Sequence, residues 1–202
     1  MNYRWQETMK ILIPGFYGVT SVCVVYVLTH FRLDTAMCEN MSKLSALLMV
    51  GFFFIAFFIG FINEIISGEL EFFLYKMGLP RPSNLVLNST FKRFSIVRID
   101  DLRRKLGLSL NEVVDNRESA VALAKAKQSI NMETCQEFYY QSILARNLCC
   151  SHTFSSVFIY CIFDWSYVLL GVSLLIFMLL YWYWRKMNLV YVKRIFTEYV
   201  QQ

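Results

Sequence analysis

The sequence predicts an all-α membrane protein with four transmembrane helices and a small helical cytoplasmic insertion between the second and the third. Composition is the first observation: 56% of the 202 residues are hydrophobic, only 17% are charged, and the mean hydropathy is +0.42. Globular chains carry roughly 25% charged residues, so this balance excludes a disordered chain or a disulfide scaffold and indicates an apolar solvent. Long uncharged runs and the distribution of Lys and Arg are the other two observations.

The uncharged runs set the number of spans. A helix needs about 20 mainly apolar residues to cross a hydrocarbon core of roughly 30 Å. Residues 11–31 and 44–62 reach that length without Lys, Arg, Asp or Glu, which predicts the first and second spans. The third apolar stretch is too long for one span. It predicts a helical hairpin with spans over 148–163 and 165–184.

The Lys and Arg residues predict the orientation, because positive charges near a membrane stay on the cytoplasmic side. With four spans, three segments share one side: 1–10, 63–147 and 185–202. These segments hold all of the 20 Lys and Arg residues except Arg32 and Lys43, which are the first and last residues of the outer loop 32–43. We therefore expect a multi-pass protein of the inner cell membrane with both termini in the cytoplasm.

The insertion 63–147 is expected to contain short helices. The second helix is predicted to continue to Lys76, where Gly78-Leu79-Pro80 stops it. Two further short helices are expected over 101–106 and 110–114, an arrangement like the opening of a helix-turn-helix. No basic recognition helix follows this pair, so the sequence disfavours direct DNA binding.

The last part of the insertion predicts a helix that enters the membrane. No Gly or Pro lies between Arg117 and Arg146, and Ser129-Ile130-Asn131 is the one expected interruption, with Asn131 capping a new start. The helix that starts at Met132 is predicted to run unbroken into the third span. Such a helix would couple movement of the cytoplasmic part to the membrane helices.

The residue patterns of enzymes are missing from this sequence. The spans contain no pair of carboxylates, and there is no Gly-x-Ser-x-Gly elbow, no phosphate-binding Gly-rich loop and no His-Glu-x-x-His. Cys149, Cys150 and His152 offer at most three ligands, whereas a structural zinc needs four. We therefore predict a non-enzymatic protein with no cofactor and no metal.

A polar stripe follows one face of the third span, where Asn147, Ser151 and Ser155 recur every four residues. Two interpretations stay open. Small hydroxylated residues mediate helix contacts in lipid, or the stripe lines a water-filled path in an oligomer, together with polar residues of the first span. The pore-lining candidates are Asn147, Ser151, His152, Ser155, Ser156, Thr20 and Ser21.

Basic side chains gather in two clusters of the insertion. They are Lys92, Arg93 and Arg98, then Arg103, Arg104 and Lys105. Such clusters serve as topology determinants or contact anionic lipid headgroups. Arranged around an oligomer axis, they would instead hold an anionic ligand such as a nucleotide or an oligonucleotide.

Three features of the layout are shared with known membrane proteins: Ile13-Pro14-Gly15 opening the first span, a compact insertion, and Glu137-Phe138-Tyr139-Tyr140 with Ala145-Arg146 before the third span. In this layout the chain resembles small four-pass membrane effectors of bacterial anti-phage defence systems, of the Hailong type. The resemblance implies a homo-oligomeric ion channel, opened by a cytoplasmic signal, that depolarises the membrane during infection. A second resemblance, to Kiwa-type membrane sensors, implies a scaffold that recruits a soluble cytoplasmic partner. No motif transfers a functional residue.

Overall fold

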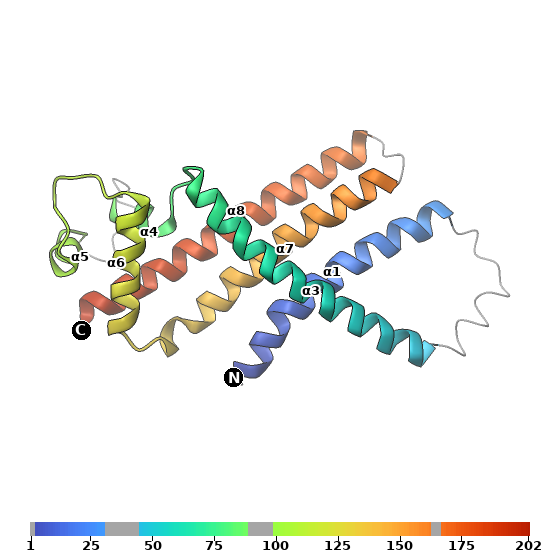
Figure 1. Ribbon diagram of the computed structural model, residues 1–202, viewed down its shortest axis with the longest axis horizontal. Coiled ribbons are helices and arrows are strands. Elements are labelled where there is room, and N and C mark those ends of the chain that lie inside the picture. The colour runs from blue at the N-terminus through green and yellow to red at the C-terminus, as the bar shows by residue number, and fades with distance from the viewer. Residues whose placement is uncertain (1–2, 31–44, 89–98, 163–166) are drawn as a thin grey trace. The chain divides into compact units, whose positions relative to one another are not determined.

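The computed structural model describes residues 3–30, 45–88, 99–162 and 167–202, and every regular element in those ranges is an α-helix (Figure 1). The predicted all-α class is confirmed. In chain order the elements are α1 (Tyr3–His30), α3 (Ser45–Lys76), α4 (Pro82–Leu87), α5 (Ile99–Leu106), α6 (Asn116–Ser129), α7 (Glu133–Ile162) and α8 (Tyr167–Gln201). The predicted outer loop 32–43 and the hairpin turn at 163–166 lie outside the described residues.

Three helices in the described part of the chain are long and apolar enough to cross a membrane. The qualifying stretches are Trp5–Val25 in α1, Met49–Lys76 in α3 and Tyr167–Gln201 in α8. Helix α7 spans the predicted third crossing, but the polar stripe lowers its hydropathy and it is not among the three. The structure thus supports a membrane protein, while the crossing by α7 and the count of four spans remain proposals.

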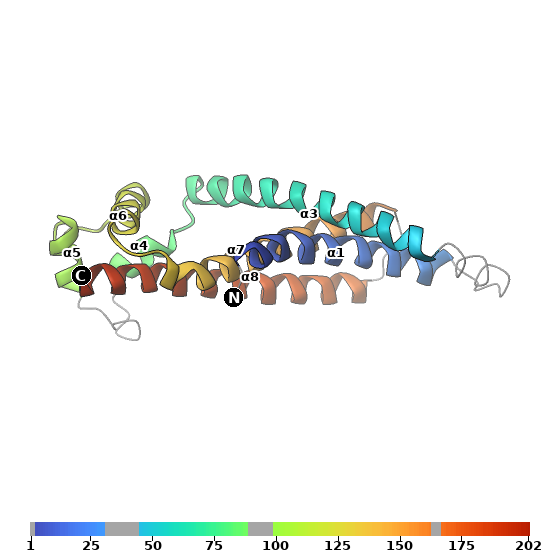
Figure 2. The ribbon, with the colours of Figure 1, turned by 90° about the horizontal axis from the view of Figure 1, so that it is seen from below.

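The chain divides into two compact units. One contains residues 1–68 and 143–182 and is called the membrane unit here; the other contains 69–142 and 183–202 and is called the helical unit. Helices α3, α7 and α8 each contribute residues to both units, whereas α1 belongs to the membrane unit alone (Figure 1, Figure 2).

Helices α1 and α3 of the membrane unit approach closely at two glycines. A Cβ atom added to Gly15 would overlap the carbonyl oxygen of Ala56, and one added to Gly60 would overlap the carbonyl oxygen of Ile11. Such small residues let backbones meet in a membrane, where packing and not hydrophobic burial drives helix association. In the part of α3 that belongs to the membrane unit, the exposed phenylalanines, which are typical of a lipid-facing surface, are Phe53, Phe54, Phe57, Phe58 and Phe61.

The helical unit has its own apolar core. Helices α4, α5 and α6 pack with the first residues of α7 and the last residues of α8. The most deeply buried core residues, each at most 1% exposed, are Leu87, Leu102, Ala126, Cys135, Ile195 and Phe196. The core of the helical unit is therefore built from residues far apart in the sequence, and the end of α8 supplies several of them.

Two predicted helix boundaries are confirmed. Helix α3 ends at Lys76, and Gly78 follows with a φ of +103°, while the Leu79 N–H donates to the Leu74 carbonyl at 3.0 Å, as in a glycine-terminated C-cap. Asn131 separates α6 from α7, and its side-chain oxygen accepts the Glu133 N–H at 3.0 Å. From there α7 runs unbroken to Ile162, as expected.

The prediction of a second short helix over 110–114 is wrong, because these residues form a loop. The sequence reading also missed α4, which begins at Pro82, where the fixed φ of proline suits the first turn of a helix. Helix α5 spans Ile99–Leu106, so it begins two residues before the predicted start at Asp101.

Candidate functional site

The predicted stripe on α7 faces the backbone of α1. The Asn147 side-chain amide donates to the Lys10 carbonyl at 3.1 Å, and the Ser151 hydroxyl donates to the Pro14 carbonyl at 2.7 Å. One turn further, the Ser155 hydroxyl reaches the Gly18 carbonyl at 3.4 Å. Donors and acceptors both advance by four residues, so α1 and α7 run parallel. These three donors are at most 7% exposed, which agrees with the packing interpretation of the stripe.

Pro14 explains why an asparagine stands at position 147. Proline has no N–H, so the Lys10 carbonyl four residues earlier loses its partner in α1. A buried backbone carbonyl without a donor is costly unless another group satisfies it. The Asn147 amide provides that hydrogen bond from the neighbouring helix.

Asn147 also joins α7 to α3. Its side-chain oxygen accepts the Ser67 hydroxyl at 2.6 Å, and its backbone carbonyl accepts the Asn63 amide at 2.7 Å. Asn147 is fully buried. Beside this junction Lys10 and Glu64 form an ion pair at 3.0 Å. Buried polar contacts of Asn147 therefore connect three helices of the membrane unit, α1, α3 and α7.

A second polar cluster lies on the adjacent face of α7, centred on His152. The Tyr17 hydroxyl of α1 lies 2.7 Å from Nδ1 of His152, and the Ser173 carbonyl of α8 lies 2.9 Å from Nε2. A carbonyl only accepts hydrogen bonds, so the Nε2 atom is assigned the hydrogen of this contact. The His152 ring is thus tied to both neighbouring helices, α1 and α8.

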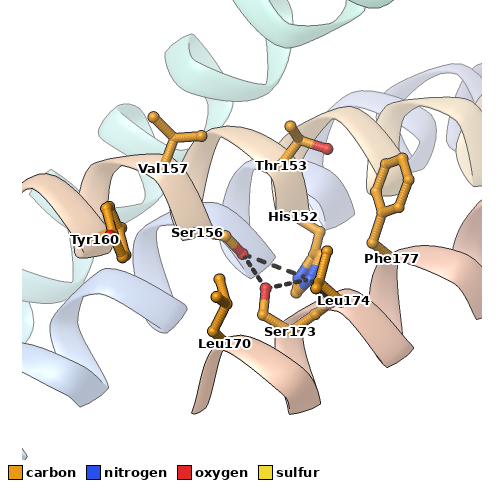
Figure 3. Close-up of a pocket in the computed structure, with 9 residues that line it drawn as sticks. All are labelled: His152, Thr153, Ser156, Val157, Tyr160, Leu170, Ser173, Leu174 and Phe177. Atoms are coloured by element: carbon orange, nitrogen blue, oxygen red, sulfur yellow. Dashed lines mark hydrogen bonds between the residues drawn. The ribbon is translucent and has the colours of Figure 1, made fainter. Parts of the chain in front are cut away.

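Two serines complete the His152 cluster. The hydroxyl oxygens of Ser156 and Ser173 are 2.8 Å apart, and they lie 3.5 Å and 3.2 Å from Nε2 of His152. Figure 3 shows the three side chains pointing toward one another between α7 and α8. The name His152 cluster is used below for Tyr17, His152, Ser156 and Ser173.

A cavity of about 320 Å³ opens beside the His152 cluster (Figure 3). Its walls are mostly apolar, and its polar groups gather at the cluster. The lining residues are His152, Thr153, Ser156, Val157 and Tyr160 of α7 with Leu170, Ser173, Leu174 and Phe177 of α8. Pockets of this size, apolar with a few convergent polar groups, are typical of ligand sites.

The two first-span candidates lie apart from this cluster. Ser21 donates to the Tyr17 carbonyl of its own helix at 2.7 Å, and Thr20 is exposed. Tyr17 is the residue of α1 that joins His152 instead. The sequence reading missed Tyr17 and also Ser173. A signal for Ser173 existed, because Ser156 and Ser173 are equally far from the centre of the predicted hairpin turn.

The six basic residues proposed to bind an anionic ligand or lipid differ in their surroundings. Lys92, Arg93 and Arg98 lie outside the described residues. Arg104 is exposed, whereas Lys105 donates to the Tyr199 carbonyl at 2.8 Å, near the end of α8. Arg103 is 7% exposed, and its guanidinium bonds to backbone carbonyls of the helical unit.

The Arg103 guanidinium holds the loop between α5 and α6. Its Nε and Nη2 atoms donate to the Leu87 carbonyl at 3.0 and 2.8 Å, and Nη2 also donates to the Asn88 side chain. Its Nη1 atom shares its two hydrogens among three loop carbonyls, those of Ser109, Leu110 and Glu112. These bonds fix a non-helical path for residues 107–115, which explains why no helix forms at 110–114.

We expect Arg103→Met to open this loop, because the substitution leaves buried carbonyls without donors. Cleavage after Glu112 by a glutamate-specific protease should become about tenfold faster, equivalent to about 1.4 kcal/mol of local stability. The matched control is Arg104→Met on the neighbouring, exposed position. Equal cleavage rates in the two variants would contradict the structural role of Arg103.

Metal ligands do not converge in the part of the chain that the structure describes, where no three His, Cys, Asp or Glu side chains form a group. Both ring nitrogens of His152 are engaged by protein groups. The polar groups of the His152 cluster are therefore used mainly to join α1, α7 and α8, and the cavity beside them is lined mostly by apolar side chains.

Comparisons of the chain with protein-family models, curated protein sequences and solved structures find no match. The chemistry of the site is therefore judged from its own geometry.

Proposed function

We propose that this protein is a non-enzymatic, homo-oligomeric membrane effector that passes ions under the control of its helical unit. The observation that supports this proposal is the continuity of α7 and α8. Helix α7 places Cys135 in the core of the helical unit and His152 in the membrane unit; α8 does the same with Ile195 and Ser173. A rearrangement of that core would move α7 and α8, two of the three helices that carry the His152 cluster.

The proposed topology has four spans, with α7 as the third crossing and the helical unit in the cytoplasm. The cost of taking α7 through the bilayer is reduced because its polar residues are paired: the stripe with α1, and His152 with Tyr17 and Ser173. The distribution of Lys and Arg supports the same orientation. The resemblance to defence effectors would make infection the trigger.

The proposed ion path uses the His152 cluster and not the whole stripe. Asn147, Ser151 and Ser155 are occupied with α1, so they hold α7 in place. Ser156 and Ser173 instead border the cavity, where copies of the chain would bring hydroxyls toward a shared axis.

Purified protein reconstituted in liposomes tests the proposal through ion flux. Wild-type protein should release a K⁺ gradient, and Ser156→Leu with Ser173→Leu should slow the flux at least about tenfold, because apolar side chains remove the polar lining. Ser21→Ala, which changes a serine bonded to its own helix, is the control. Impermeable wild-type liposomes, or undiminished flux through the double variant, would contradict it.

A second candidate function, a scaffold that recruits a soluble partner, is favoured by one surface. The loop held by Arg103 exposes Leu110 (42%) and Val113 (83%), and exposed apolar side chains on a fixed loop are typical of partner docking. Loss of partner capture from Val113→Asp, with no ion flux in liposomes, would support this function over the first.

A further inference from the structure

We propose that the surface of the helical unit around the end of α3 binds the headgroup of an anionic phospholipid. Exposed apolar side chains are the first observation. Phe72, Phe73 and Met77 are each more than half exposed, and they share one face of α3 with the exposed Lys76, because positions four apart lie on the same side of a helix. Large apolar side chains grouped on an exposed face are typical of a docking surface.

The opposite face of this part of α3 fixes its level along α8. The Glu71 carboxylate accepts hydrogen bonds from the Tyr75 hydroxyl at 2.8 Å and from the Asn188 amide of α8 at 3.0 Å. In the proposed topology Asn188 lies four residues beyond Trp184, the last residue of the fourth span, which is about 6 Å along the helix. A headgroup layer is about 5–7 Å thick. The exposed face of α3, which begins one residue after Glu71, therefore lies at the level of the headgroups.

Two arginines at the same level supply groups that bind phosphate. The Arg185 Nη2 atom donates to the Pro80 carbonyl at 2.9 Å, and the guanidinium carbon of Arg81 lies 4.9 Å from the centre of the Tyr75 ring. Neither guanidinium forms an ion pair with a carboxylate of the residues that the structure describes. Arginine pairs well with phosphate oxygens. The basic residues of this surface are Lys76, Arg81, Arg185 and Lys186, and they outnumber the acids of this part of α3, Glu69 and Glu71.

Apolar and basic side chains at one level favour an anionic lipid over other occupants. Such a combination is typical of proteins that bind a membrane surface, where each Lys or Arg contributes about 1 kcal/mol toward anionic lipids. A free anion would leave Phe72 and Phe73 exposed, and a zwitterionic lipid brings a positive charge of its own. A second copy of the chain would bring the same excess of basic residues, which repel one another. The proposal rests on the crossing by α8, and not on ion conduction.

Lipid binding to the full chain in detergent tests the proposal. The protein is titrated with phosphatidylglycerol, which is anionic, and with phosphatidylcholine of the same acyl chains, and bound lipid is counted by native mass spectrometry. The wild-type protein should bind phosphatidylglycerol at least about fivefold more tightly, which corresponds to about 1 kcal/mol. Arg81→Gln with Arg185→Gln should remove this preference, whereas Arg81→Lys with Arg185→Lys keeps both charges and should retain most of it.

A matched pair of substitutions controls for the loss of charge. Arg117→Gln with Arg194→Gln removes two positive charges elsewhere on the helical unit, where Arg117 is exposed and Arg194 forms a surface ion pair of little energetic value. This pair should keep the preference for phosphatidylglycerol. Lys76→Glu changes only an exposed side chain and should reduce the preference, so it decides the test if the first glutamine pair does not fold. Equal affinity of the wild type for both lipids, or an equal loss in both glutamine pairs, would overturn the proposal. No conductance is measured, so failure of the proposed function is a separate result.

Discussion

Replacing Gly60 with valine is expected to lower the free energy of unfolding by about 3 kcal/mol, the upper end of the usual cost of overpacking. Any side chain at this position meets the Ile11 backbone of α1 and not the flexible end of a side chain. The helices must separate, which also loosens the contacts of Asn147. For a chain of this size the melting temperature should fall by roughly 6–12 °C.

Gly51 supplies the control for this prediction. It lies on the same helix, and an added Cβ would meet nothing within 4 Å. Gly51→Val should therefore leave the melting temperature of the detergent-solubilised protein nearly unchanged. If both valine variants melted alike, the close crossing of α1 and α3 would be refuted.

The second large effect is expected from Asn147→Leu. This change removes two side-chain hydrogen bonds, those with the Lys10 carbonyl and the Ser67 hydroxyl, from a fully buried position. Loss of both bonds and an unpaired carbonyl should cost about 2–3 kcal/mol. Ser155→Ala, which removes the longest bond of the stripe, should cost much less.

A double-mutant cycle that combines Pro14→Ala with Asn147→Leu tests whether Asn147 compensates for the missing N–H of the proline. Pro14→Ala restores an N–H that can donate to the Lys10 carbonyl within α1. In that background Asn147→Leu should cost about 1 kcal/mol less than in the wild type, measured by thermal unfolding. Strictly additive penalties would show that Asn147 does not compensate for the proline.

Local signals in the sequence were sufficient for much of the fold. The end of α3 follows from Gly78, and the start of α7 from the Asn131 cap, because the residues that form these boundaries are adjacent in the chain. The face of α7 also followed from spacing, since positions four apart share one side of a helix. The partner of that face did not, because the acceptors are backbone carbonyls of α1, which any sequence provides.

The features that the sequence did not predict have one physical cause. Contacts between residues far apart in the chain override the local preference of a segment. Arg103 looked like its neighbours Arg104 and Lys105, yet it is buried and its bonds hold residues 107–115 in a loop. Ser173 lies in an apolar run, and its role comes from contacts with Ser156 and His152 of α7. Such roles become visible when the register between helices is known.

The most direct measurement of the central claim, that α7 crosses the membrane as the third of four spans, is the location of the carboxyl terminus. A Gln202→Cys variant, with the natural cysteines replaced by alanine, would be exposed to a membrane-impermeant maleimide in intact cells. Four spans predict labelling only after the membrane is permeabilised, as for Arg104→Cys, while Thr35→Cys in the expected outer loop reacts at once. Labelling of Cys at position 202 in intact cells would leave three spans and contradict the account.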